Sequence, residues 1–338
     1  MLVVRPIQYS DYDDLYNIAV ESGHGFTSLP LNETILKKRI ERAQHSFEKA
    51  VKVPKSESYL FVIEDSNSGK VVGTSGIEAS VGLEDAFYHY RLGKVVHSSH
   101  ELNIYNTIDT LSLCNDYTGA AELCTLFLSE PYRVNNNGRF LSRSRFLFMA
   151  EHKTRFSKTV IAEMRGVSDS QGRSPFWNWL EEHFFSMDFP TADYLTGIGK
   201  KAFIAELMPK FPIYVSLLNK DAQQVIGEVH KNTAPALKLL ENEGFSRRGY
   251  VDIFDAGPTV EAKLKDINSV KNSQKMQVNI ANVKHGKNYI VANLNIETFR
   301  AVQVTTEIDA LNQQVYLPAE VADKLLVSEG DWVRILEN

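Results

Sequence analysis

The spacing of apolar and polar positions predicts an alternation of strands and helices from the start of the chain. Residues 2–7 form a β-branched run interrupted by Pro6, which predicts a first strand. Apolar residues then recur at helical spacing over 11–22 and 33–51, so two helices should follow. In 58–82, two apolar runs flank a polar turn, a pattern typical of a β-hairpin.

The middle of the chain continues this alternation. Buried strands are expected at 122–128 and 159–166, with helices at 140–153 and 174–185. Residues 225–243 predict a strand, a turn and a helix, with Gly244 at the helix C-terminus. One or two further strands are expected in 250–264.

Three segments determine the expected domain organisation. Residues 83–115 indicate an irregular insertion or additional strands, and a second insertion is expected near 186–220. Residues 265–275 are polar and aperiodic, which predicts a linker. We therefore expect one domain over 1–265 and a small β-barrel-like domain over 276–338.

Composition and charge narrow the class of protein. The 338 residues are 43% hydrophobic and 23% charged, as in a globular protein, and the net charge of −5 does not favour a nucleic-acid partner. No apolar run approaches the roughly 20 residues of a membrane span, and the first residues lack a secretory pattern. Two cysteines, Cys114 and Cys124, are typical of a reduced, cytoplasmic protein. No residues have metal-ligand spacing, so we expect no metal.

The segment between the strand at 122–128 and the next helix contains the strongest chemical signal. Its asparagines and glycine tolerate left-handed backbone geometry and expose N–H groups at a helix start, where an anion can bind. Flanking arginines supply charge suited to phosphate oxygens, so a diphosphate is the expected ligand; the alternative is a solvated helix-start turn. The candidate residues are Arg133, Asn135, Asn136, Asn137, Gly138 and Arg139.

This turn resembles motif A of the GCN5-related N-acetyltransferase superfamily, Q/R-x-x-G-x-G/A. Arg133 and Gly138 match its first and last positions, while Asn136 replaces its first glycine. The segment 232–245 resembles a later helix motif of the same superfamily. More narrowly, residues 5–19, 22–30, 122–152 and 226–245 together resemble the bacterial arginine N-succinyltransferases, and the resemblance extends over most of the chain.

The resemblance implies an α+β fold, with a mixed sheet flanked by helices, in which the motif A strand splays from its neighbour to admit acyl-CoA. It places Leu126 at the succinyl-CoA contact and the proton donor on His230. It implies transfer of the succinyl group of succinyl-CoA to the α-amine of L-arginine by direct attack. No cofactor would be bound permanently, because succinyl-CoA is a co-substrate.

Several alternatives remain open. The acceptor or donor could instead be ornithine or acetyl-CoA, because motif A recognises CoA in either case. A regulatory protein that binds CoA or an amino acid without catalysis is a different class. Residues 315–336 resemble small β-domains of transcription regulators, but they contain few basic residues and several acidic ones. We expect a homo-oligomer or an assembly with a related subunit.

The remaining candidates concern the substrates. His230 is either an acid, a base or a packing residue, and His24 is a loop residue that could face substrate. A guanidinium needs carboxylates, and a succinyl group needs a cation. Cys124 and the aromatic residues of 176–185 are interpreted as core or interface residues. The acids considered are Glu122, Glu163, Asp109 and Asp255, and the groups considered for the succinyl carboxylate are Arg143, Arg145 or a serine.

Overall fold

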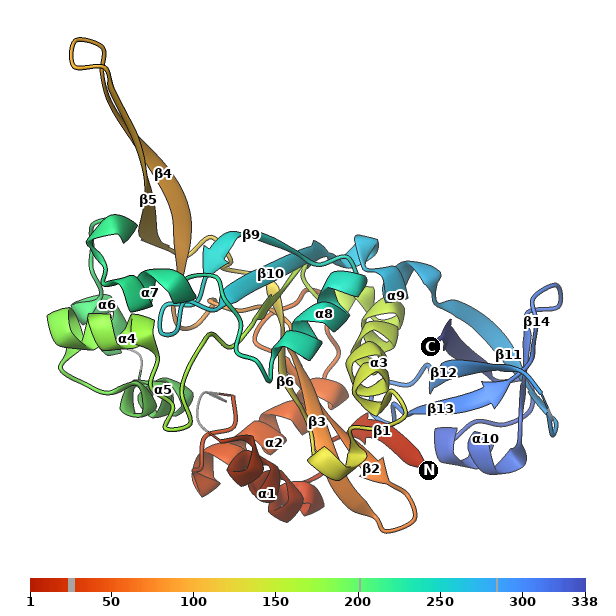
Figure 1. Ribbon diagram of the computed structural model, residues 1–338. Helices are drawn as coiled ribbons and strands as arrows, with labels where there is room; N and C mark the ends of the chain where they lie inside the picture. The colour runs from red at the N-terminus through yellow and green to blue at the C-terminus, as the bar shows by residue number, and fades with distance from the viewer. Residues whose placement is uncertain (24–27, 201, 284) are drawn as a thin grey trace.

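The computed structural model describes residues 1–23, 28–200, 202–283 and 285–338. The candidate His24 lies outside these described residues. Figure 1 shows three parts along one axis: a helical lobe with a projecting hairpin, a central sheet covered by helices, and a C-terminal β-rich unit.

The elements of the first half begin with two helices inserted between strands. Their order is β1 (Leu2–Pro6), α1 (Tyr12–Ser22), α2 (Glu33–Glu48), β2 (Ser58–Asp65), β3 (Lys70–Glu78), β4 (His89–Ser99), β5 (Ile104–Cys114), β6 (Ala121–Leu128), α3 (Asn137–Glu151) and β7 (Thr159–Glu163). The hairpin predicted for 58–82 is β2–β3, and the segment 83–115 forms the long hairpin β4–β5 rather than an irregular insertion.

The second half begins with short helices and ends in strands. Its elements are α4 (Pro175–Leu180) with a π-helical turn (Glu181–Phe185), α5 (Phe189–Gly197), α6 (Ala202–Leu207), β8 (Ile213–Tyr214), α7 (Lys220–Val225), α8 (Ala234–Asn242), β9 (Ser246–Val251), β10 (Pro258–Lys263), α9 (Asn268–Asn272), β11 (Gln274–Ile280), β12 (Lys287–Asn293), β13 (Ala301–Thr306), β14 (Ile308–Asp309), β15 (Gln314–Leu317), α10 (Ala319–Leu325) and β16 (Trp332–Glu337).

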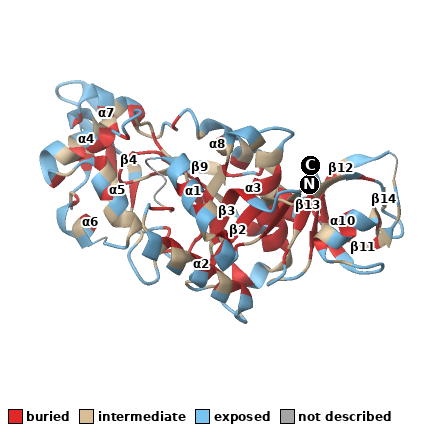
Figure 2. Ribbon diagram, turned by 90° about the horizontal axis from the view of Figure 1, so that it is seen from below, coloured by how far each residue is buried: buried red, intermediate tan, exposed pale blue. Residues whose placement is uncertain are grey.

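The described strands join into one sheet of 16 strands, in the order β14-β15-β11-β16-β12-β13-β1-β2-β3-β6-β7-β10-β9-β4-β5-β8. β1 connects the two parts of the sheet, because it pairs with β2 on one side and with β13 on the other. Helices α1 and α2 pack on one face of the central strands and α3 on the opposite face. Buried residues accordingly follow the sheet between these helices (Figure 2).

Two predictions about local structure are wrong. The strand predicted at 225–230 is absent: α7, whose start is capped by the Asn219 side chain, ends at Val225, and only Val229 forms a single bridge, to Gly166. The predicted linker at 265–275 instead contains a 3-10 turn and α9, because Ile267 and Val270 are buried in the core beneath α3.

Candidate active site

Strands β6 and β7 separate soon after they begin to pair. Their parallel register extends over Ala121↔Val160 and Glu122↔Ile161, while β6 stays paired with β3 as far as Leu128. The flank of β6 from 123 to 128 that faces β7 therefore has no register partner among the described strands. Main-chain groups on such a flank can pair with an extended ligand in the way an added strand would.

A β-bulge lies in β6 within this splayed part. The register with β3 passes from Gly76↔Cys124 to Thr74↔Phe127, so Thr125 and Leu126 together face one residue of β3. Thr125 has a φ of 55°, which is strained for a β-branched residue. Its carbonyl accepts a hydrogen bond of 2.8 Å from the Thr74 hydroxyl, which helps to hold the bulge. Leu126, the residue placed by resemblance at the acyl-CoA contact, is part of the bulge.

The turn after β6 has the geometry expected of an anion site. Asn135 and Asn136 are both left-handed, with φ of 52° and 61°, and Asn137 is the first residue of α3. The helix start has no side-chain cap and no acidic residue in its first turn, so its N–H groups can bind an external anion. A Cβ at Gly138 would meet no atom within 4 Å, so packing does not explain the glycine.

The two arginines of this turn are held differently. Arg133 Nε donates to the Leu128 carbonyl at 2.7 Å, and its guanidinium lies 5.5 Å from the centre of the Phe127 ring. Burial lowers the pKa of Arg139, and the neighbouring charge of Arg143 lowers it further. A bound diphosphate would relieve that repulsion.

His230 lies beside the end of β7, close to where the strands separate. Its main-chain N–H donates to the Arg165 carbonyl at 2.9 Å, and its own carbonyl accepts from Thr233 and Ala234 at the start of α8. The Nδ1 atom accepts a 3.2 Å hydrogen bond from the Asn232 N–H, so the neutral ring carries its proton on Nε2. Burial lowers the pKa of His230, and Arg165 and Lys231 lower it further.

The structure brings together two of the four candidate carboxylates. Glu122 and Glu163 project from β6 and β7 on the same face of the sheet, because Glu122 is opposite Ile161 and Glu163 follows two residues later. Burial, together with the neighbouring charges of Glu163 and Glu78, raises the pKa of Glu122 to about 8. The imidazole of His89, which is 0% exposed, places Nε2 2.9 Å from Glu163 Oε1.

The other two candidate carboxylates have different roles. Asp109 forms an exposed ion pair of 2.8 Å with Lys94 on the projecting hairpin. Asp255 is buried and accepts hydrogen bonds from the N–H groups of Gly166 and Gly257, which hold two loops together. Neither arrangement leaves a carboxylate directed at the splayed strands.

The candidates for the succinyl carboxylate are also engaged elsewhere. Arg143 is paired with Glu243 at 2.8 Å. Arg145 is 2% exposed, and its hydrogen bonds go to Ser142 and to the carbonyls of Gly76 and Cys124 behind the bulge. Both arginines thus stabilise the scaffold around the site.

Cys124 does not have the surroundings of a nucleophile. Burial, together with the acids Glu78 and Glu122, raises its pKa to about 12. Trp177 is 0% exposed and packs in the helical lobe, as the core interpretation expects. In the described ranges, no group of three His, Cys, Asp or Glu residues could hold a metal ion. None of the helices described is long and apolar enough to cross a bilayer.

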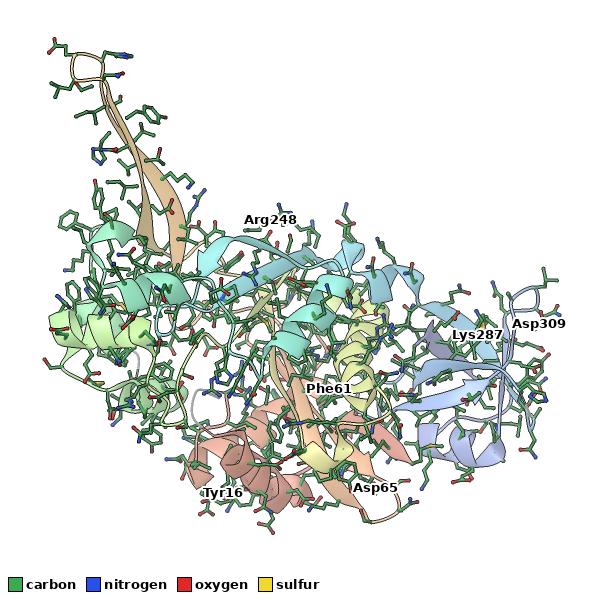
Figure 3. All side chains as sticks on the ribbon, in the orientation of Figure 1. Tyr16, Phe61, Asp65, Arg248, Lys287 and Asp309 are labelled. Carbon is green, nitrogen blue, oxygen red and sulfur yellow. The ribbon has the colours of Figure 1, made fainter. Side chains whose placement is uncertain are left out.

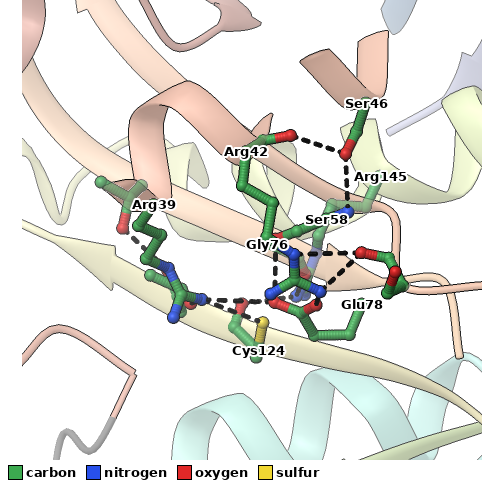
Figure 4. A network of polar contacts seen from close by, with 11 residues as sticks. Arg39, Arg42, Ser46, Ser58, Gly76, Glu78, Cys124 and Arg145 are labelled. Carbon is green, nitrogen blue, oxygen red and sulfur yellow. Dashed lines mark hydrogen bonds and ion pairs between the residues drawn. The ribbon is translucent and has the colours of Figure 1, made fainter. Parts of the chain in front are cut away.

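Sequence reasoning missed three residues: Arg39 next to the bulge, its neighbour Glu78, and His89 beside Glu163. Arg39, on α2, donates to Thr125 Oγ1 at 2.9 Å, and its Nη2 lies 3.6 Å from Glu78 (Figure 4). Each belongs to an element distant in sequence from β6, so no local motif signals it. Only the periodicity of α2 indicates that Arg39, one position before buried Ile40, lies at the edge of the helix's packed face.

The splayed parallel pair, the bulge and the uncapped helix start form the arrangement that the resemblance to the GCN5-related acyltransferases implies, so the class of protein is an acyltransferase. Comparison with known families is more specific. The model of the "arginine N-succinyltransferase beta subunit" matches residues 2–269, and that of its C-terminal domain matches 274–337. The chain belongs to the arginine N-succinyltransferase family.

Individual relatives match over nearly their whole length. An arginine N-succinyltransferase from Yersinia pseudotuberculosis serotype IB (strain PB1/+) is 49% identical over 344 residues, covering 99% of this chain and 97% of the relative. One from Escherichia coli O6:K15:H31 is 49% identical over 339 residues, with the same coverage. The solved structure of arginine/ornithine succinyltransferase subunit AI from Pseudomonas aeruginosa is 38% identical, has a TM-score of 0.92, and covers 100% of this chain and 98% of that one.

Proposed function

We propose that this protein transfers the succinyl group of succinyl-CoA to the α-amine of L-arginine. The main structural support for this proposal is the separation of β6 from β7 beside the bulge at Thr125 and Leu126. Membership in the arginine N-succinyltransferase family and relatives at 49% identity over 99% of the chain support the choice of reaction. No permanently bound cofactor is needed, because the acyl-CoA brings the reactive group.

The acyl-CoA would lie in the splay with its diphosphate at the turn 133–139. Main-chain N–H groups at the start of α3 and the guanidinium groups of Arg133 and Arg139 would bind the phosphate oxygens. The main-chain N–H of Leu126, in the bulge, would donate to the thioester oxygen as negative charge develops there. The Asn135–Asn136 turn is already in the left-handed geometry that aims the helix start at a ligand.

The chemical step needs one proton to move. The nitrogen of the neutral amine bonds to the thioester carbon, and the carbon–sulfur bond breaks. The amine loses one proton and the departing thiolate gains one. His230, at the end of β7 beside the splay, is the residue proposed to exchange this proton. Its lowered pKa favours the uncharged ring, whose Nδ1 would take the amine proton in place of the 3.2 Å hydrogen bond from the Asn232 N–H and then pass a proton to the thiolate.

The cationic acceptor would approach the face that carries Glu122 and Glu163. Two carboxylates on adjacent strands suit a guanidinium or an ammonium group, and a bound cation would lower the raised pKa of Glu122. Ornithine, which the name of the Pseudomonas aeruginosa relative includes, is the second candidate acceptor.

A thiol-release assay tests this function. Purified protein is mixed with succinyl-CoA and arginine, ornithine or lysine, and the same series is run with acetyl-CoA. We expect free CoA to appear fastest with succinyl-CoA and arginine, together with N-succinylarginine by mass spectrometry. Release at the rate of spontaneous hydrolysis for every pair would contradict the proposal, and faster release with ornithine would reassign the acceptor.

We also propose that the protein works in the cytoplasm as an oligomer or with a related subunit. The Pseudomonas aeruginosa relative is named as a subunit. The distal part of the β4–β5 hairpin extends away from the body with side chains on both sides (Figures 1 and 3), and Leu102 and Tyr105 there are 70% and 72% exposed. A two-stranded ribbon is marginal in water alone, so light scattering should show a mass above that of one 38.2 kDa chain.

A further inference from the structure

Arg39 reaches from helix α2 to the bulge of β6. Its Nη2 atom donates a 2.9 Å hydrogen bond to the Thr125 hydroxyl and lies 3.8 Å from Cys124 Sγ. Thr125 precedes Leu126, whose N–H is proposed to face the thioester oxygen. The guanidinium therefore lies over the part of β6 where the acyl group would be held (Figure 4).

The positive charge of Arg39 is only weakly compensated. The nearest carboxylate, Glu78, is 3.6 Å away and already bound on both oxygens: Oε2 accepts from Arg42 at 2.7 Å and Oε1 from the Ser58 hydroxyl at 2.8 Å. Arg39 Nε is buried and has no hydrogen-bond partner in the part of the chain that the structure describes. A buried guanidinium N–H without an acceptor is costly unless a ligand supplies one.

The other nearby acids do not neutralise Arg39 fully. The raised pKa of Glu122, about 8, keeps much of that carboxyl protonated at neutral pH, and its causes are burial followed by Glu163 and Glu78. Glu163 lies on β7 with His89 Nε2 2.9 Å from its Oε1. Among the described residues, Arg39 thus has one carboxylate within 4 Å, Glu78, whose two oxygens are engaged by Arg42 and Ser58, so a ligand carboxylate could pair with Arg39 more closely than Glu78 does.

We propose that Arg39 binds the free carboxylate of the succinyl group and so selects succinyl-CoA over acyl-CoA molecules that lack this carboxylate. Three carbon–carbon bonds separate the thioester carbon from the succinyl carboxylate carbon, a reach of about 4 Å. This suits a thioester at Leu126 and a guanidinium over Cys124 and Thr125. A guanidinium binds a carboxylate through paired charge-assisted hydrogen bonds, which acetyl-CoA cannot form.

The assignment rests on the proposed function, and the test separates the two. Wild type, R39Q, R39K and R42Q are compared for kcat/KM with succinyl-CoA and with acetyl-CoA, and for the Kd of each donor by calorimetry. Arg42 is the matched control: it lies on the same helix and binds the same Glu78, but it is 47% exposed and its other hydrogen bonds go to the Ser56 carbonyl, away from the bulge. If wild type does not succinylate any amine, the proposed function fails, whatever the variants do.

We expect R39Q to lower the ratio of kcat/KM for succinyl-CoA to that for acetyl-CoA by about 10- to 100-fold, because a charge-assisted pair is lost. R39K, which keeps the charge but not the planar pair of donors, should lose about 3- to 10-fold of the same selectivity, and R42Q should leave it unchanged. If R39Q does not fold, R39K decides the question. Equal losses for both donors would mean that Arg39 only holds the bulge, and an unchanged selectivity in R39K would likewise overturn the assignment.

Discussion

Two regions of the same sheet, the C-terminal strands and the strands around β6, differ in how regularly they pair. In the C-terminal unit, β12 pairs without a register shift with β13 and β16, and the strands enclose an apolar core. Around β6 the sheet is irregular: it splays, bulges at Thr125 and continues into a turn with two left-handed asparagines. Regular pairing satisfies the main chain internally, whereas irregular pairing leaves main-chain groups for a ligand. The regular C-terminal region is therefore expected to contribute mainly to stability, and the irregular region around β6 is the proposed site of the chemistry.

The largest expected effect comes from removing His230, the proposed proton carrier of the irregular region around β6. H230A should lower kcat by about 100- to 10,000-fold, the usual contribution of a positioned acid or base, because the amine and thiolate then exchange their proton with water. The Kd for succinyl-CoA should stay near the wild-type value, since His230 is not at the diphosphate turn. Steady-state kinetics with calorimetry as the control measures both; unchanged turnover would remove His230 from the mechanism.

A core substitution in the regularly paired C-terminal unit should have the opposite effect: it should lower stability and leave kcat unchanged. Val291 is 0% exposed in β12, between Val302 of β13 and Ile335 of β16. V291A should reduce the free energy of unfolding by about 2–3 kcal/mol through lost burial and a cavity. Below its unfolding transition, kcat should remain unchanged. A fall in kcat without a loss of stability in urea titrations would mean that this unit takes part in chemistry.

Adding a methyl group at the start of α3 tests the proposed diphosphate site with a smaller expected effect. G138A should leave the unfolding midpoint equal or slightly higher, because alanine favours a helix and its Cβ would meet no protein atom. It should raise the Kd for CoA about tenfold, a loss of about 1.4 kcal/mol of binding free energy, because the added methyl group occupies the space of the diphosphate. Pantetheine, which lacks the diphosphate, is the control ligand and should bind the variant as it binds wild type. Equal affinity for CoA would place the phosphates elsewhere.

The smallest expected effect is a pH dependence of stability that arises between α3 and the C-terminal unit. Burial lowers the pKa of His152, at the end of α3, to about 4. The unfolded chain binds this proton below about pH 6.5 and the folded chain only below about pH 4, so stability falls as pH decreases through that window. H152Q should lose about 1 kcal/mol less than wild type between pH 6.5 and 5.5, measured by urea unfolding at each pH. An identical loss in both proteins would exclude His152 as a source.

Local signals predicted the parts of the site that are local in sequence. The turn 133–139 could be predicted because asparagine and glycine determine backbone geometry over a few residues. The strand prediction within 225–230 is wrong because β-branched residues such as Val225 and Ile226 favour a strand, whereas Asn219 caps a helix that continues to Val225. The linker prediction failed because Ile267 and Val270, three residues apart, were too few to show a period.

Long-range features of the site could not be predicted in the same way. Which acids meet depends on the parallel pairing of β6 with β7, and this pairing placed Glu122 with Glu163 while excluding Asp109 and Asp255. Arg39 is one of several charged residues of α2, and the sequence of this helix does not show which of them contacts β6. Its contact with Thr125 joins residues 86 positions apart.

The measurement that tests the central claim most directly is a crystal structure of the protein with CoA bound. The diphosphate is predicted to lie within hydrogen-bond distance of the main-chain N–H groups of Gly138 and Arg139, with the pantetheine arm along β6 between Leu123 and Leu128. Coenzyme bound elsewhere, with the turn 133–139 in contact only with water, would contradict the account.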